Sequence, residues 1–148
     1  MSETEIGQSP TNENVSLETP SVANTAQLAG MAVRGLGVDL CEIARMQRLL
    51  DESRPLKRMF TEEEQAYIRA KGMSAAQTMA GLFAAKEAIL KALGTGLTIA
   101  MTDISISHTP LGQPLVTMTG KAAEMGGTVM VSITHEAGMA AAFAVWTE

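Results

Sequence analysis

Residues 74–96 read SAAQTMAGLFAAKEAILKALGTG and form the longest helical pattern in the sequence. Its large apolar residues recur at helical spacing, which predicts one amphipathic helix from about Ser74 to Leu93. Glycine readily adopts the left-handed conformation that ends many helices, so we expect the helix to stop at Gly94. The predicted apolar stripe consists of Met79, Leu82, Phe83, Leu90 and Leu93.

The segment at residues 32–40 predicts a strand with two unlike sides. One side carries Gly35, Gly37 and Asp39, and the alternate positions are apolar. Two glycines beside a carboxylate leave room for another group to approach the backbone closely. The apolar side consists of Leu36, Val38 and Leu40.

The remaining elements are expected to be short. Thr61 is followed by glutamates at 62–64, a helix-start signature with a hydroxyl cap and a glutamate three residues on. Other short helices are expected at 42–50 and 121–125, and strands at 102–107, 114–119, 128–134 and 139–146. The pattern predicts an α+β fold, in which a mainly antiparallel sheet packs with one long and several short helices.

The length of 148 residues fits one folded domain. Residues 1–30 are polar, aperiodic and free of Lys and Arg, so we predict a disordered tail ahead of a domain at 31–148. Without the four acidic residues of the tail, 11 basic and 12 acidic residues remain. This near-neutral balance is not that of a nucleic-acid-binding protein.

Targeting signals and membrane spans are not evident. No apolar run approaches the ~20 residues of a membrane helix, and the first thirty residues lack the pattern of a secretory signal. The single cysteine, Cys41, permits no internal disulfide. We therefore expect a cytoplasmic protein that does not bind membranes.

Several ionisable residues stand at positions that suit chemistry. Lys86 falls within the apolar stripe, where it must snorkel, pair, or meet an anionic ligand. Glu87 and Lys91 share a helix face that could hold a metal and a phosphate, although this spacing is also that of an ordinary surface pair. Asp39 is either a strand-end residue or a ligand, and His135 is either a hydrogen-bonded turn residue or a functional one.

Motifs of several large enzyme classes are absent from the sequence. There is no P-loop, no dinucleotide-binding glycine motif after a strand, and no serine-hydrolase elbow. A local cationic face is nevertheless indicated, because five of the eleven basic residues fall within residues 45–58. They are Arg45, Arg48, Arg54, Lys57 and Arg58.

Three segments together resemble the holo-acyl-carrier-protein synthase family of 4′-phosphopantetheinyl transferases. They are GLGVDLCEIARM at 35–46, FAAKEAILKALGTG at 83–96 and VSITH at 131–135, and the resemblance extends over 31–148. It implies the 4′-phosphopantetheinyl transferase fold and transfer of the phosphopantetheine arm of coenzyme A to a serine of an apo acyl carrier protein, releasing 3′,5′-ADP. An inactive module that binds coenzyme A or a carrier protein is the alternative, because Leu82 stands where the family usually has Arg or Lys.

The resemblance also implies roles for individual residues. Asp39 and Glu87 match two Mg²⁺ ligands, and Arg45 matches a residue that docks acidic carrier-protein side chains. The positions expected to contact coenzyme A are Lys86, Lys91, Gly94, Thr95, Gly96 and His135, and those expected to be catalytic are Glu87, Lys91 and His135. The group that accepts the serine proton is left open between a metal-bound water, Glu87 and His135.

Finally, the resemblance implies a homotrimer with active sites between subunits. In this arrangement Asp39 and His135 of one subunit would meet Glu87 and Lys91 of a neighbour. The implied pathway is fatty-acid or lipid biosynthesis.

Overall fold

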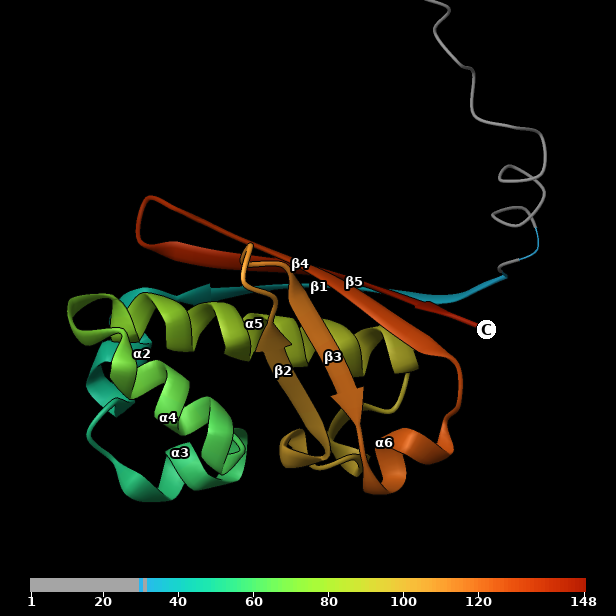
Figure 1. Ribbon diagram of the computed structural model, residues 1–148, viewed down its shortest axis with the longest axis horizontal. Helices are drawn as coiled ribbons and strands as arrows, with labels where there is room; N and C mark the ends of the chain where they lie inside the picture. Colours follow the sequence, from blue (N-terminus) through green and yellow to red (C-terminus); the bar gives the residue numbers. More distant parts are fainter. Residues whose placement is uncertain (1–29, 31) are drawn as a thin grey trace, which may run out of the picture. The chain divides into compact units, whose positions relative to one another are not determined.

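A computed structural model describes Gly30 and residues 32–148 (Figure 1). The tail predicted at residues 1–30 therefore lies outside the described residues, apart from Gly30. The elements are β1 (Val33–Glu42), α2 (Ile43–Leu49), α3 (Ser53–Met59), α4 (Glu62–Ala70), α5 (Ala75–Leu93), β2 (Ile104–His108), β3 (Pro114–Met118), α6 (Gly120–Glu124), β4 (Thr128–Glu136) and β5 (Met139–Thr147), with single 3₁₀ turns η1 (Gly72–Ser74), η2 (Gly96–Thr98) and η3 (Met101–Asp103).

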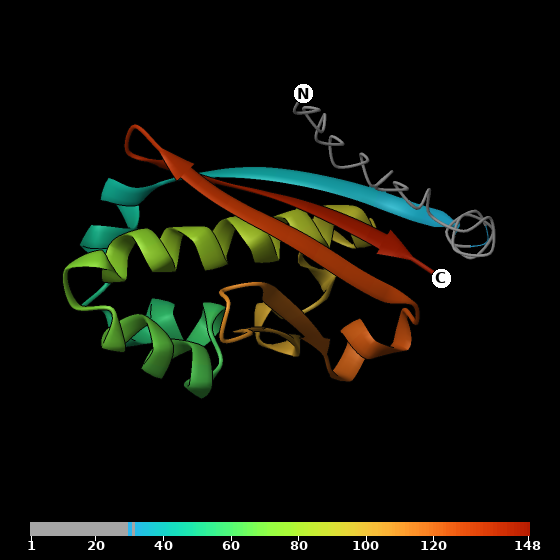
Figure 2. The same cartoon turned by 45° about the horizontal axis from the view of Figure 1, so that its top comes forward.

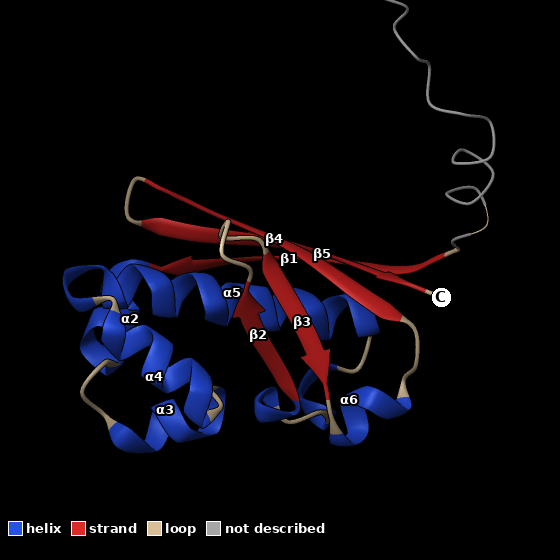
Figure 3. Cartoon of the chain, viewed as in Figure 1, coloured by secondary structure: helices blue, strands red, loops and turns tan. Residues whose placement is uncertain are grey.

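This architecture confirms the predicted α+β fold. Three long strands form an antiparallel sheet in the order β1-β5-β4, and β2 and β3 form a separate antiparallel pair. Helix α5 runs along one face of the three-stranded sheet (Figure 2). The short helices α2, α3 and α4 gather near one end of α5, while β2, β3 and α6 lie towards the other (Figure 3).

Local sequence explains how the helices begin and end. The capping box predicted at Thr61 is present: its hydroxyl accepts a hydrogen bond from the Glu64 amide, and the Glu64 carboxylate accepts one from the Thr61 amide. Helix α5 ends at Gly94, whose φ of 70° is left-handed, as predicted. Helix α3 has no clear periodicity in the sequence, and it tolerates Pro55 because the proline lies in its first turn.

The backbone of β1 rests directly on the backbone of α5. A Cβ atom at Gly37 would lie 1.8 Å from the carbonyl oxygen of Ala88, and one at Gly35 would lie 1.9 Å from that of Ala92. The close approach predicted from the two glycines is therefore confirmed, and the approaching element is α5. Its small alanine side chains are fully buried in this contact or nearly so.

The opposite face of the sheet is apolar, and none of the described helices covers it. Its three adjacent strands present Leu36, Val38 and Leu40 from β1, Phe143 from β5 and Met130 from β4, all exposed. An antiparallel sheet normally turns polar residues to water on its free side. We call these five residues the outer apolar face.

No helix among residues 32–148 is both long and apolar enough to cross a membrane.

The contact between β1 and α5 predicts an unusual sensitivity to one methyl group. We expect Gly37→Ala to lower the free energy of unfolding by at least about 3 kcal/mol, because the new methyl meets rigid helix backbone rather than a movable side chain. Ser107→Thr, which also adds one methyl to a strand but at an exposed position, is the control. Urea denaturation measures both, and a Gly37→Ala protein as stable as the control would contradict the contact.

Candidate active site

Asp39 and Lys91 meet where β1 crosses the last turns of α5. Asp39 lies on the same side of β1 as the two glycines, and it therefore faces the helix. Lys91 Nζ donates to Asp39 Oδ1 at 2.8 Å and to the carbonyl oxygen of Val38 at 2.9 Å. The Lys91 side chain is 53% exposed, so the pair lies at a surface that a ligand can reach, and it contributes less than about 1 kcal/mol to stability.

Glu87 lies one helical turn before Lys91 and belongs to the same cluster of charges. Burial raises the pKa of Glu87, and the nearby Asp39 carboxylate raises it further, whereas Lys91 and Arg45 act in the opposite direction. Within the described residues Lys91 forms its ion pair with Asp39 and not with Glu87. Lys91 therefore pairs with a residue of a different element, and not with Glu87 as a surface pair on the helix would require.

The two carboxylates fit a hard divalent cation. Mg²⁺ prefers oxygen ligands, and it is commonly held by one or two carboxylates while waters and substrate phosphates fill its other positions. Among residues 32–148 no group of three or more Asp, Glu, His or Cys side chains is placed to hold a metal. Asp39 and Glu87 suit a cation that they share with a ligand. Such a cation would also remove the repulsion from Asp39 that raises the pKa of Glu87.

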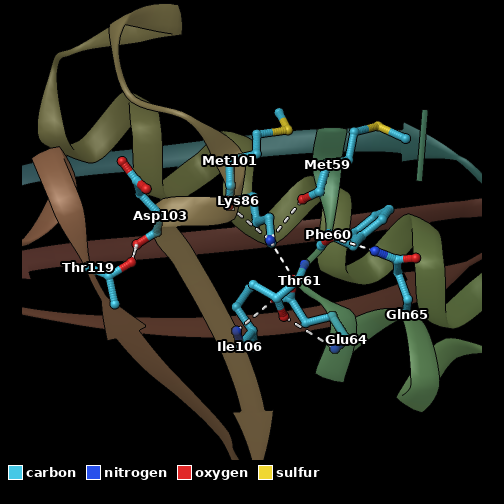
Figure 4. A network of polar contacts seen from close by, with 10 residues as sticks. All are labelled: Met59, Phe60, Thr61, Glu64, Gln65, Lys86, Met101, Asp103, Ile106 and Thr119. Atoms are coloured by element: carbon cyan, nitrogen blue, oxygen red, sulfur yellow. Dashed lines mark hydrogen bonds and ion pairs between the residues drawn. The ribbon is translucent and has the colours of Figure 1, made fainter. Parts of the chain in front are cut away.

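Lys86 lies in the protein core instead of at the ligand surface (Figure 4). Its side chain is 0% exposed and pairs with the Glu64 carboxylate, which is 1% exposed, at 2.6 Å. Its other two donor positions are used by the carbonyl oxygens of Met59, at 2.8 Å, and Met101, at 2.9 Å. The prediction that Lys86 contacts the coenzyme A phosphates is therefore wrong. A lysine in the apolar stripe could snorkel, pair, or meet an anionic ligand, and in this fold Lys86 is paired.

His135 lies apart from Glu87 within one chain. Gln77 Nε2 donates a hydrogen bond to His135 Nε2 at 3.0 Å, and Gln77 precedes Glu87 by ten residues of α5. At 1.5 Å per residue, Gln77 and Glu87 are separated by about 15 Å along the helix.

The expectation that Asp39 and Lys91 come from different subunits is wrong, because they contact each other in the same chain.

The histidine instead belongs to a small cavity of about 250 Å³ at the start of α5. His108 stacks on Tyr67 in this cavity, with ring centroids 4.8 Å apart. Burial lowers the pKa of His108, and the nearby Lys71 lowers it further. Leu82, the departure from the family pattern, also lines the cavity and is itself buried.

The glycine loop after α5 has the backbone that its sequence predicts. Gly94 and Gly96 both have left-handed φ angles, of 70° and 55°, and Thr95 between them has a regular negative one. The Thr95 hydroxyl oxygen is buried and has no hydrogen-bond partner among the described residues. The loop begins three residues after Lys91, less than one helical turn from the charge cluster.

A groove of about 1000 Å³ adjoins this cluster through Arg45. Its basic side chains are Arg45, Arg54, Lys57 and Arg58, and we call it the cationic groove. Apolar residues alternate with these charges, among them Phe83, Leu97, Met59 and Met101. The cationic face indicated by the sequence is thus a groove, although Arg48 does not line it.

Two apolar contributors to the groove were not predicted as site residues. Phe83 is indicated by the sequence only as part of the apolar stripe, yet its ring lies 5.4 Å from the Arg45 guanidinium. Leu97 is 87% exposed in the 3₁₀ turn η2, directly after the glycine loop. Because Leu97 lies outside every periodic segment, helix and strand patterns give no signal for it.

Comparison with known proteins identifies the family. The model of the 4′-phosphopantetheinyl transferase superfamily matches residues 35–144, which include every residue of the charge cluster. The chain belongs to this superfamily. A holo-[acyl-carrier-protein] synthase of Treponema denticola is 38% identical over 119 residues, covering 76% of this chain and 97% of that protein. One from Trichlorobacter lovleyi is 40% identical and covers 74% and 94%.

Solved structures agree with the assignment to the phosphopantetheinyl transferases. A holo-(acyl-carrier-protein) synthase of Bacillus anthracis, in complex with CoA (3′,5′-ADP), superposes with a TM-score of 0.69 at 31% identity and covers 80% of this chain and 99% of that one. The enzyme of Helicobacter pylori in complex with coenzyme A gives a TM-score of 0.67 at 30% identity, over 76% and 99%. The likeness spans almost the whole of both neighbours.

Proposed function

We propose that this transferase is a Mg²⁺-dependent holo-acyl-carrier-protein synthase, which moves 4′-phosphopantetheine from coenzyme A to a serine of an apo acyl carrier protein. The observation that carries the proposal is the ion pair of Asp39 and Lys91 beside a cationic groove, with Glu87 near enough for both charges to act on it. Two carboxylates and an accessible ammonium are what a metal-assisted phosphoryl transfer needs. The related synthases support the same reaction.

The chemistry follows from the charges that the cluster provides. The serine oxygen attacks the β-phosphorus of coenzyme A, a new P–O bond forms, and the P–O bond to 3′,5′-ADP breaks. Asp39 and Glu87 would hold Mg²⁺, which when bound neutralises negative charge on the pyrophosphate. Lys91 is exposed enough to leave Asp39 and to place its ammonium against a phosphate oxygen. The serine proton passes to water, Glu87 or His135.

The same geometry weighs against an inactive binding module. Leu82 lines the cavity around His135, about one and a half helical turns before Glu87, and its burial leaves Asp39, Glu87 and Lys91 in place. We therefore expect turnover, with Leu82 affecting one contact around the coenzyme. We also propose that the reaction serves fatty-acid or lipid biosynthesis in the cytoplasm.

The cationic groove is the proposed docking site for the carrier protein. Opposite charges steer association and set the orientation of the partner, and an apolar centre supplies contact area. Arg45 lines the groove and also acts on the charge of Glu87, so a carrier bound there would lie next to the reacting groups. Arg54, Lys57 and Arg58 extend the positive surface for an acidic partner.

A homotrimer with shared active sites accounts for two further features. The outer apolar face exposes five large side chains to water in a single chain, and such patches usually mark an interface. His135 lies about 15 Å along α5 from Glu87, too far to act on the same phosphate from the same chain. We propose that neighbouring copies pack through the outer apolar face, and that His135 of one copy reaches the charge cluster of another.

Removing charge from the metal pair tests the central part of the proposal. We expect Asp39→Asn and Glu87→Gln each to reduce the transfer rate at least a hundredfold with little change in unfolding, since both are polar and near the surface. The double variant should be little worse than either single variant, because a site without one ligand has little left to lose. Transfer rates as a function of Mg²⁺ concentration measure this.

The matched control for the metal pair is Glu124→Gln on α6, an exposed glutamate outside the site. It should keep the wild-type rate and Mg²⁺ dependence. A Glu87→Gln enzyme with unaltered Mg²⁺ dependence would exclude Glu87 as a ligand.

Charge reversal in the cationic groove tests carrier docking. We expect Arg45→Glu to raise the KM for the carrier at least tenfold and to flatten its salt dependence, while the KM for coenzyme A stays within about threefold. Arg48→Glu is the control, because Arg48 is on the same helix but does not line the groove. Equal effects of the two variants would mean that Arg45 acts only through net charge.

A charged residue on the outer apolar face tests the trimer. Sedimentation velocity should show a trimer for the wild type and a monomer for Phe143→Asp, because three buried carboxylates cannot be accommodated in an apolar interface. Leu111→Asp, at a fully exposed position in the loop between β2 and β3 and outside the outer apolar face, should remain trimeric. A monomeric wild type, or a trimeric Phe143→Asp protein, would disprove this interface.

A further inference from the structure

The core contains an ion pair that the proposed reaction does not use. Lys86 and Glu64 are joined at 2.6 Å and are shielded from water almost completely. Burying two charges is costly, and an apolar pair of similar volume is often as stable or more so. Stability alone therefore does not account for the pair, and its other contacts show what it holds in place.

Glu64 connects three separate segments. Its Oε2 accepts hydrogen bonds from Lys86 Nζ and from the Thr61 amide at the start of α4. Its Oε1 accepts a hydrogen bond from the amide of Ile106 in β2, at 2.8 Å. One carboxylate thus fixes the first turn of α4 relative to β2 and α5 (Figure 4).

Lys86 extends this network to two segments of the cationic groove. It donates to the carbonyl oxygens of Met59, the last residue of α3, and of Met101, the first residue of η3. Both methionines line the groove, together with the basic residues of α3 and the segment 99–102. A single ammonium group therefore bridges the α3 segment and the η3 segment.

The same network is tied to the charge cluster through α5. Glu87 follows Lys86 directly in the sequence, so the buried pair and the charge cluster are adjacent on one helix. The ammonium also lies 5.4 Å from the ring of Phe60, which follows Met59 and is itself buried. Three hydrogen bonds and this ring leave Lys86 one position.

We propose that the buried pair of Lys86 and Glu64 is a positioning element that holds the α3 and η3 segments at the spacing at which the cationic groove accepts its protein partner. This inference rests on the proposed function of the groove, and it assigns no contact with substrate to either residue. Without the pair, Met59 and Met101 lose their common donor, and the two segments are free to move apart. Carrier affinity should suffer before coenzyme A affinity does.

The test is the double variant Lys86→Met/Glu64→Gln, which removes both charges and leaves no unpaired ion in the core. We expect the KM for the carrier to rise at least tenfold while the KM for coenzyme A stays within twofold. A merely structural role would reduce the amount of active enzyme and so lower the apparent kcat, without moving one KM relative to the other. Glu63→Gln, an exposed neighbour on α4, is the control.

Hydrogen exchange of the full chain provides a second measurement that needs no turnover. Amides of residues 54–60 and 99–103 should exchange at least tenfold faster in the double variant, while those of β4 and β5 keep their wild-type rates. If the double variant does not fold, Lys86→Arg, which keeps a positive charge paired with Glu64 but changes the reach to the Met59 and Met101 carbonyl oxygens, should show the same changes in smaller size.

The outcomes separate this inference from the proposed function. A wild type that transfers nothing would remove the proposed function, and hydrogen exchange would then decide whether the pair positions the two segments. Equal rises of both KM values, or unchanged exchange in residues 54–60 and 99–103, would overturn the positioning role.

Discussion

The close contact between the backbones of β1 and α5 is the constraint on which the rest of the site depends. It requires glycine at positions 35 and 37, because a methyl group at either would overlap a helix carbonyl oxygen. The same contact places Asp39, two residues after Gly37, against the last turns of α5 where Glu87 and Lys91 are found. The close packing that these two glycines permit thus places the charged residues of the site near one another.

Charged residues that are close in the sequence of α5 lie on different sides of the helix because of its periodicity. Lys86 and Lys91 are five residues apart, roughly 140° around the helix. One is therefore held in the core by Glu64 and two carbonyl oxygens, and the other is exposed beside Asp39. The burial of the two lysines differs because each side of the helix packs against different elements, and not because of any difference in the side chain.

Local patterns in the sequence predict most of the fold. The long helix, its end at Gly94, the capping box at Thr61 and the close approach at Gly37 each depend on a few adjacent residues, and each is present. The partner of Lys86 could not be predicted in this way. Glu64 lies 22 residues away and looks like an ordinary helix-start glutamate in the sequence, so only tertiary packing reveals its second role.

The part of the site that could be predicted from the sequence is the part that lies on two contacting elements, β1 and α5. Asp39, Glu87 and Lys91 come together because one strand crosses one helix. His135 lies near the end of β4, which pairs with β5, and its distance from Glu87 depends on where β4 ends along α5, which no spacing in the sequence encodes. Leu97 of the cationic groove belongs to a turn without periodicity.

The most direct measurement is the intact mass of an apo acyl carrier protein after incubation with this chain, coenzyme A and Mg²⁺. The proposed reaction predicts a gain of one phosphopantetheine group on the carrier, and no gain when Mg²⁺ is chelated. Carriers of unchanged mass across a panel from several pathways, or the same gain with the metal removed, would contradict it.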